Sequence, residues 1–227
     1  MHVEPGIVQA SKIGLSYGTA FTSIILALKA TKLCFKEDGP LSFIFKTFMT
    51  TLLVFTFFEV FPHYPVGVSE VHFILGSTLF LLFGTAPAAF GLALGLLIQG
   101  LFFAPTDIPQ YGVNVTTLLI PLFAMSALAK KFIPKNTAYK DIKYADALKL
   151  SLTYQGGVVA WVAFWAFYGQ GFGAENLASV ASFGASYMSV VLLEPFIDLA
   201  LLAAVKMWSS PGHVFYFHKR LFEPLGK

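Results

Sequence analysis

Residues 86–104 read APAAFGLALGLLIQGLFFA, nineteen consecutive residues without a charged side chain. About 20 predominantly apolar residues cross the hydrocarbon core of a bilayer as an α-helix. The stretch therefore predicts a transmembrane helix. Gly91 and Gly95 form a GxxxG pattern on it, which permits close contact with a neighbouring helix.

The composition of the whole chain agrees with this assignment. Of the 227 residues, 56% are hydrophobic and only 12% are charged, and the mean hydropathy is +0.72. Soluble domains carry about twice that share of charged residues. Most of the surface is therefore expected to face lipid, and the net charge of +3 does not suggest nucleic-acid binding.

Six further apolar segments predict an all-α, polytopic membrane protein with about seven transmembrane helices. The third segment is shorter than the others and follows a turn-rich stretch. No repeat or linker divides the chain, so we expect a single transmembrane domain over residues 1–227: an N-terminal segment (1–12), a helical bundle (13–207) and a tail (208–227). The expected spans are residues 13–31, 41–61, 71–84, 86–104, 113–132, 146–168 and 180–207.

The lysines predict the orientation. Seven spans put fourteen of the fifteen basic residues on the side of the C-terminus and leave only Lys12 on the other side. Because cytoplasmic loops carry the excess of Lys and Arg, we expect the C-terminus to be cytoplasmic and the N-terminus to lie outside the cell (inner) membrane. The residues on the cytoplasmic side are Lys29, Lys32, Lys36, Lys46, Lys130, Lys131, Lys135, Lys140, Lys143, Lys149, Lys206, Lys219, Arg220 and Lys227.

The outer side is expected to be acidic and to carry nitrogen ligands. Acidic residues there outnumber the single lysine, and a surface of this sign attracts cations. Met1, His2, His63 and His72 fall on the same side. The acidic residues are Glu4, Glu59, Glu70, Asp107 and Glu175.

The first two residues can chelate a metal. Residues 1–30 show no cleavable signal peptide, and a bulky second residue is expected to leave Met1 in place. The α-amine, the amide nitrogen of His2 and its imidazole Nδ1 then close two fused chelate rings. Deprotonating the amide requires a strongly polarising d-block ion such as Ni²⁺ or Cu²⁺, which favours a planar nitrogen field. Three nitrogens leave one position of that plane to another residue.

His72 is the leading candidate for the fourth position. It stands at the outer start of the expected third span, where a histidine could equally be an ordinary interfacial residue. His63 is a competing ligand, although Pro62 and Pro65 on either side of it favour a loop.

Several stretches resemble the cobalt/nickel substrate-capture components of energy-coupling-factor (ECF) ABC transporters. The similarity covers residues 1–8 and 62–121. It is carried by Met1-His-Val-Glu-Pro-Gly6 (family MHIxxG), Pro65-Val-Gly-Val-Ser-Glu-Val-His72 with Leu75-Gly76 and Leu81-Leu-Phe-Gly84, Leu96-Leu-Ile-Gln-Gly-Leu-Phe-Phe103 (family LLIQALLF) and Gly112-Val-Asn-Val115 (family LGANV).

The resemblance implies both ligands and partners. In this family the metal is held by the N-terminal amine, the amide and imidazole of a second-residue His, and the His of an S-x-x-H stretch. These positions match Met1, His2 and His72, with Ni²⁺ or Co²⁺ as the transported substrate and Ser69 as a supporting residue. The resemblance also implies separate ATPase subunits and a coupling transmembrane subunit, with a small accessory membrane subunit as a further candidate partner.

Two amide residues are candidates for supporting the metal site, and two stretches depart from the family sequence. Gln99 and Asn114 could support the metal site, or they could form ordinary interhelical hydrogen bonds. Where the family shows a Gly-rich stretch before the Asn, this chain has PTDIPQYG at residues 105–112. A family-like EGxxT near the last helix is EPFID at residues 194–198. These departures concern the metal preference and the coupling surface.

Glu194 and Asp198 lie one helical turn apart in the last span. Ionisable residues inside a membrane are candidates for function. They could contact a partner and couple transport, relay protons, or pair with Lys206.

Three functions remain open from the sequence. The first is a metal-capture subunit that is not an enzyme and, lacking a G-x-x-x-x-G-K-[ST] phosphate loop, does not hydrolyse ATP itself. The second is a vitamin-binding component of the same transporter class. The third is an intramembrane metalloenzyme with Glu70 as a general base, although no H-E-x-x-H helix is present.

Overall fold

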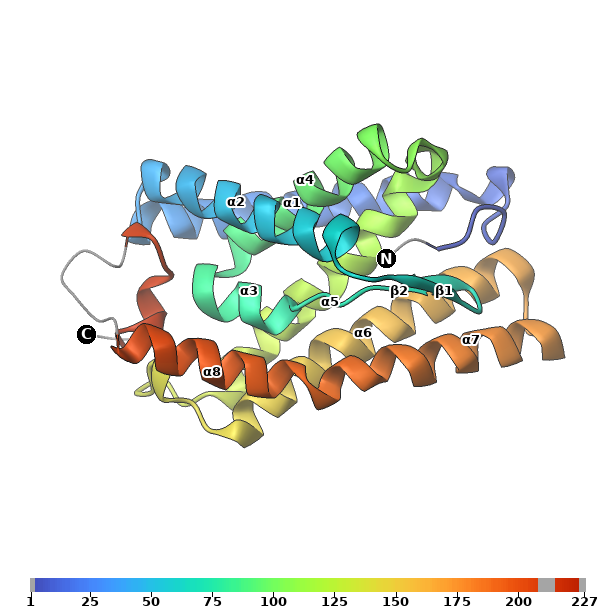
Figure 1. Ribbon diagram of the computed structural model, residues 1–227. Helices are drawn as coiled ribbons and strands as arrows, with labels where there is room; N and C mark the ends of the chain where they lie inside the picture. Colours follow the sequence, from blue (N-terminus) through green and yellow to red (C-terminus); the bar gives the residue numbers. More distant parts are fainter. Residues whose placement is uncertain (1–2, 208–214, 225–227) are drawn as a thin grey trace.

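Six helices of the computed structural model are long and apolar enough to cross a membrane, within residues 3–207 and 215–224, which are the residues that the structure describes. They confirm the prediction of an all-α, polytopic membrane protein (Figure 1). The helices are α1 (Gly14–Glu37), α2 (Pro40–Phe55), α4 (Thr85–Phe102), α5 (Tyr111–Phe132), α6 (Tyr144–Gln170) and the consecutive pair α7 (Ala174–Tyr187) and α8 (Glu194–Met207).

Short turns extend or join these helices. A π-helical turn, η2, continues α2, and a 3₁₀ turn, η5, connects α7 to α8 so that the two together make the last crossing. The turns are η1 (Ala10–Lys12), η2 (Thr56–Val60), η3 (Pro105–Gln110), η4 (Tyr139–Asp141), η5 (Met188–Leu192) and η7 (Lys219–Leu221).

The third expected span is not a long helix. Residues 64–71 form an antiparallel hairpin of β1 (Tyr64–Val66) and β2 (Ser69–Val71), and after a link of four residues comes α3 (Gly76–Phe83). The eight residues of α3 span about 12 Å, less than half of a bilayer core of about 30 Å. The third passage is therefore a hairpin followed by a half-length helix.

The hairpin packs against protein along its second strand, where Ser69 is buried, whereas Tyr64 of the first strand is 67% exposed. Irregular backbone is tolerated in membranes only where other protein segments or water satisfy its polar groups. Gly67 turns the hairpin with φ +60°, and its Cα lies so close to the backbone of Ser179 in α7 that a side chain would overlap it. The short turn and the absent Cβ together seat the hairpin against α7 (Figure 1).

The basic loops gather at one end of the bundle. The α1–α2 connection, the segment between α5 and α6 and residues 215–224 lie at the end where α3 terminates, and the start of α1 and the α6–α7 connection lie at the opposite end (Figure 1). This arrangement agrees with the lysine pattern. The assignment of that end to the cytoplasm stays a prediction from the sequence.

The GxxxG pattern of α4 is a contact with α2. A Cβ at Gly91 would overlap the side chain of Thr50, and one at Gly95 would lie 2.6 Å from Val54 Cγ1. The close approach lets Thr50 Oγ1 donate a hydrogen bond of 2.8 Å to the Pro87 carbonyl. The predicted close helix packing is confirmed, and it places α4 inside the bundle.

Candidate metal-binding site

The N-terminal segment enters the bundle in an extended conformation. Val3 is completely buried and forms an antiparallel bridge with Ser69 of β2, and the Glu4 amide donates to the Val68 carbonyl at 3.1 Å. The segment thus lies against the hairpin. Met1 and His2, the N-terminal ligands expected from the sequence, lie outside the described residues.

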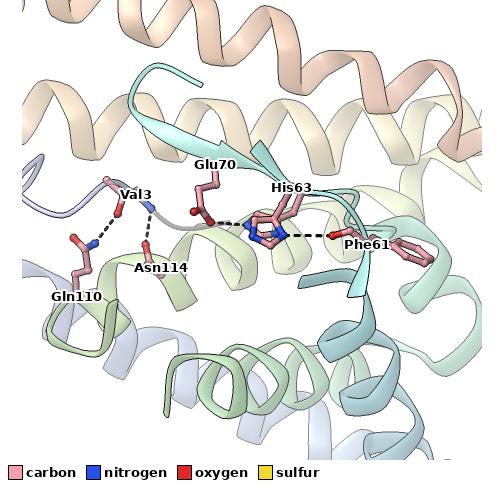
Figure 2. Close-up of polar contacts among 7 residues, drawn as sticks. Val3, Phe61, His63, Glu70, Gln110 and Asn114 are labelled. Atoms are coloured by element: carbon pink, nitrogen blue, oxygen red, sulfur yellow. Dashed lines mark hydrogen bonds and ion pairs between the residues drawn. The ribbon is translucent and has the colours of Figure 1, made fainter. Parts of the chain in front are cut away.

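Two amide side chains hold Val3 from the other side. The Val3 amide donates to Asn114 Oδ1 at 2.9 Å, and Gln110 Nε2 donates to the Val3 carbonyl at 2.6 Å (Figure 2). Asn114 is in the first turn of α5 and Gln110 precedes it by one turn, so both reach the same face. Gln110 was not identified from the sequence, because no local pattern indicates its contact with Val3, 107 residues away.

His72 lies in the link between β2 and α3 and is completely buried. The expectation that it begins a transmembrane helix is therefore wrong, because α3 begins only at Gly76. The Nε2 of His72 lies 2.9 Å from Glu70 Oε2. The rings of His72 and Phe58 pack edge to face. The carboxylate fixes the orientation of the imidazole.

His63 stacks on His72. The two ring centroids are 4.8 Å apart with an interplanar angle of 16°, and His63 Nδ1 lies 3.3 Å from the Phe61 carbonyl oxygen (Figure 2). The hairpin between them brings the two histidine side chains together. The geometry therefore keeps His63 as a competing ligand.

The other two candidate supporting residues differ in position. Ser69 is buried at the bridge with Val3, three residues before His72. Gln99 is buried in α4, but among the described residues no hydrogen bond joins its side chain to Val3, Asn114 or His72. The structure thus brings Ser69 and Asn114 to Val3, places His72 three residues from that bridge, and shows no such contact for Gln99 among the described residues.

Carboxylates surround the entry of the N-terminal segment. Partial burial raises the pKa of Glu4, and the negative charges of Glu70 and Asp107 raise it further. These three acidic residues therefore lie within electrostatic reach of one another, and their combined field favours the approach of a cation.

Within residues 3–207 and 215–224, no group of three or more His, Cys, Asp or Glu side chains could hold a metal ion. A site centred on His72 therefore needs ligands of another kind, or ligands from the rest of the chain.

Glu194 and Asp198 are at a different place. Both are buried at the start of α8 and accept hydrogen bonds from the N-terminus of α3 and from α6. Neither reaches the surface, where a partner would bind. The expected alternative of a pair with Lys206 is wrong, because Lys206 Nζ bonds to Asp141 at 2.8 Å.

Comparison with known proteins gives the family. A family model described as the cobalt uptake substrate-specific transmembrane region matches residues 2–210. The fold resembles two crystal structures, each 18% identical in sequence. One, of a transition metal transporter, has a TM-score of 0.67 and covers 98% of this chain and 100% of its own. The other, of a truncated transition metal transporter, has a TM-score of 0.62 and covers 92% of this chain and 97% of its own.

A search of curated proteins found no significant match. The family model nevertheless covers nearly the whole chain, and the long apolar helices agree with it. The chain is therefore a multi-pass protein of the cell membrane that belongs to the cobalt uptake substrate-specific transmembrane family.

Proposed function

We propose that the chain captures Ni²⁺ or Co²⁺ for uptake through the α-amine of Met1, the amide and imidazole of His2, and the imidazole of His72. The observation that carries this proposal is the antiparallel bridge between Val3 and Ser69. Because the pairing is antiparallel, a step from Val3 towards the N-terminus corresponds to a step from Ser69 towards His72. The chain direction thus favours a meeting of the N-terminus with His72.

The hydrogen bond to Glu70 supports a ligand role for His72. An imidazole that donates its Nε2 proton to a carboxylate carries its lone pair on Nδ1. Histidines that bind metals commonly donate their other nitrogen in this way, which fixes the tautomer and makes the ligand more basic. Glu70 is 2.9 Å from His72 Nε2, as this arrangement requires. We therefore assign metal binding to His72 Nδ1 and the orienting role to Glu70.

The nitrogen ligands favour a late d-block dication. Ca²⁺ and Mg²⁺ prefer oxygen ligands, and intrinsic affinity rises from Co²⁺ to Ni²⁺ to Cu²⁺. Discrimination between these ions therefore depends on the geometry that the bundle imposes. Asn114 and Gln110 contribute by fixing Val3, the residue next to the proposed chelate.

The chain acts as one subunit of a larger transporter in this proposal. It carries no phosphate loop and is not an enzyme in this proposal, so separate ATPase subunits and a coupling transmembrane subunit supply the energy. A small accessory membrane subunit completes the expected set of partners. The vitamin-binding alternative is set aside because the matching family model describes cobalt uptake.

The test is metal analysis of the purified chain with a C-terminal tag only. We expect about one Ni²⁺ or Co²⁺ per chain, and loss of the metal when residues are added before Met1. Full occupancy of the extended protein would contradict the amine ligand. A matched extension after Lys227 serves as the control.

A second pair of variants separates the two stacked histidines. His72→Ala is expected to abolish stoichiometric binding. His63→Ala removes only the stacked neighbour and is expected to retain binding. The reverse result would assign the fourth position to His63.

A further inference from the structure

The N-terminus of α3 is bound to two carboxylates of α8. Ser77 contacts both: its amide donates to Glu194 Oε1 at 3.0 Å and its hydroxyl donates to Asp198 Oδ2 at 2.7 Å. Thr78 Oγ1 donates to Asp198 Oδ1. The first turn of a helix leaves its amides without partners inside the helix, so these carboxylates act as its cap.

Helix α6 supplies the remaining donors. Ser151 Oγ and Gln155 Nε2 both donate to Glu194 Oε2, the latter at 2.8 Å. All four oxygens of the pair thus accept hydrogen bonds, and every donor is electrically neutral. Glu194 is 0% exposed and Asp198 is 1% exposed.

The charge of this cluster does not balance. Among residues 3–207 and 215–224, no Lys, Arg or His is hydrogen-bonded or ion-paired to either carboxylate. The N-terminus of α3 contributes about half a positive charge. Two ionised carboxylates would leave more than one uncompensated negative charge inside a membrane domain, which is very unfavourable.

Buried polar atoms of α6 and α7 lack hydrogen-bond partners among the described residues. Tyr154 and Tyr187 are completely buried, and their hydroxyls have no hydrogen-bond partner among the described residues. The Oε1 of Gln155, whose Nε2 bonds Glu194, also has none. The ring of Tyr154 lies against Gly76, the residue before Ser77, so closely that a Cβ there would overlap it. The cluster therefore has unused acceptor and donor capacity beside the carboxylates.

We propose that Glu194 and Asp198 form a proton-binding site that holds one proton between them at neutral pH. The proton is bonded to a carboxylate oxygen of one residue, while the other carboxylate stays ionised against the N-terminus of α3. One negative charge and the helix dipole then oppose each other. Two carboxylates that share a site commonly titrate as such a pair.

Among the residues that the structure describes, few titratable groups face this site. Helix α6 presents Tyr154 and α7 presents Tyr187, both neutral phenols at ordinary pH. The sequences of α3 (GSTLFLLF) and η5 (MSVVL) contain no titratable residue. Turn η4 carries Asp141, which is paired with Lys206 at the exposed end of α8. Protonation is therefore the means by which the negative charge of the carboxylate pair is reduced.

The site is connected to the segment of His72. Gln155 Nε2 donates to both Glu194 and the Ile74 carbonyl, the latter at 2.8 Å. We therefore infer that the proton stabilises α3 and the link that carries His72, a consequence that rests on the proposed function. The proton site itself does not depend on that function and is tested without metal.

The test is infrared difference spectroscopy of the metal-free, full-length chain in H₂O and D₂O at neutral pH. A protonated carboxyl has a carbonyl band well separated from that of a carboxylate, and the band shifts on deuteration. We expect such a band in the wild type and its loss in the double variant Glu194→Gln with Asp198→Asn. The exposed Glu175→Gln is the matched control and keeps the band.

Several outcomes would overturn the proposal. These are the absence of a protonated-carboxyl band in the wild type, its persistence in the double variant, and its removal by Na⁺, which would assign the site to a metal cation. If the double variant does not fold, the single variants decide. A band that is lost or shifted in both supports the shared proton, and an unchanged band in both contradicts it.

Discussion

Replacing Asn114 by Leu should weaken metal binding without unfolding the bundle. Asn114 Oδ1 is the hydrogen-bond acceptor for the amide of Val3, and both residues are buried. A buried donor that loses its partner costs about 1–3 kcal/mol. The substitution destabilises the docked position of the N-terminal segment by this amount, so the metal affinity should fall by about 5- to 150-fold.

The global stability should change much less than the affinity. Asn114 Nδ2 is buried without a partner among the described residues. An apolar side chain of similar shape removes this unpaired donor, although it leaves the Val3 amide without its acceptor. Leu also favours the helix that Asn114 occupies. The melting temperature of the metal-free protein is therefore expected to stay within a few degrees of the wild type.

The assay is a competition titration of Ni²⁺ against a chelator of known affinity, with thermal melting on the same samples. Thr117→Val is the matched control, because Thr117 is buried on the same helix and its hydroxyl bonds, among the described residues, only to the Val113 carbonyl. The control should keep the wild-type affinity. Equal affinities for the Leu variant and the wild type would refute the role of Asn114 in docking the N-terminus.

Four further predictions concern packing and pH. Gly91→Leu should destabilise the protein by about 1–3 kcal/mol in thermal melting, because its Cβ would overlap Thr50. Gly156→Ala, with open space around it, should be neutral or slightly stabilising. Burial lowers the pKa of His218 to about 4, below its ordinary value near 6.5; stability should therefore be lost as pH falls from about 6.5 towards 4, and His218→Gln should remove this loss. In the proposed site the amine of Met1, with an ordinary pKa near 8, and the amide of His2 each release a proton when the metal binds, so titrations should show affinity rising up to about 100-fold per pH unit below that value.

The sequence predicted the long helices because each contains a long apolar run with few charged residues, and it predicted the α2–α4 contact from Gly91 and Gly95. It did not predict the hairpin. Residues 71–84 are as apolar as a short span, and composition cannot distinguish a short transmembrane helix from the end of a strand followed by a half-length helix. The evidence for the hairpin is the tertiary contact of Gly67 with α7, which only the folded chain displays.

Some residues of the candidate site could be identified from the sequence, and others could not because their roles depend on tertiary contacts. His72 and Asn114 were identified because they are polar residues at the ends of apolar segments. Gln110 and Glu70 act through contacts with Val3 and His72, and no local pattern specifies those partners. The roles of Glu194 and Asp198 also depended on packing, because their donors come from α3 and α6, far away in the sequence.

The most direct test of the central claim is the anomalous scattering of Ni²⁺ in crystals of the full-length chain, collected at the nickel absorption edge. The account predicts one peak within bonding distance of His72 Nδ1 and of the N-terminal amine, with His72 Nε2 still bonded to Glu70. A peak elsewhere in the bundle, or one that contacts His63 and leaves His72 unbound, would contradict it.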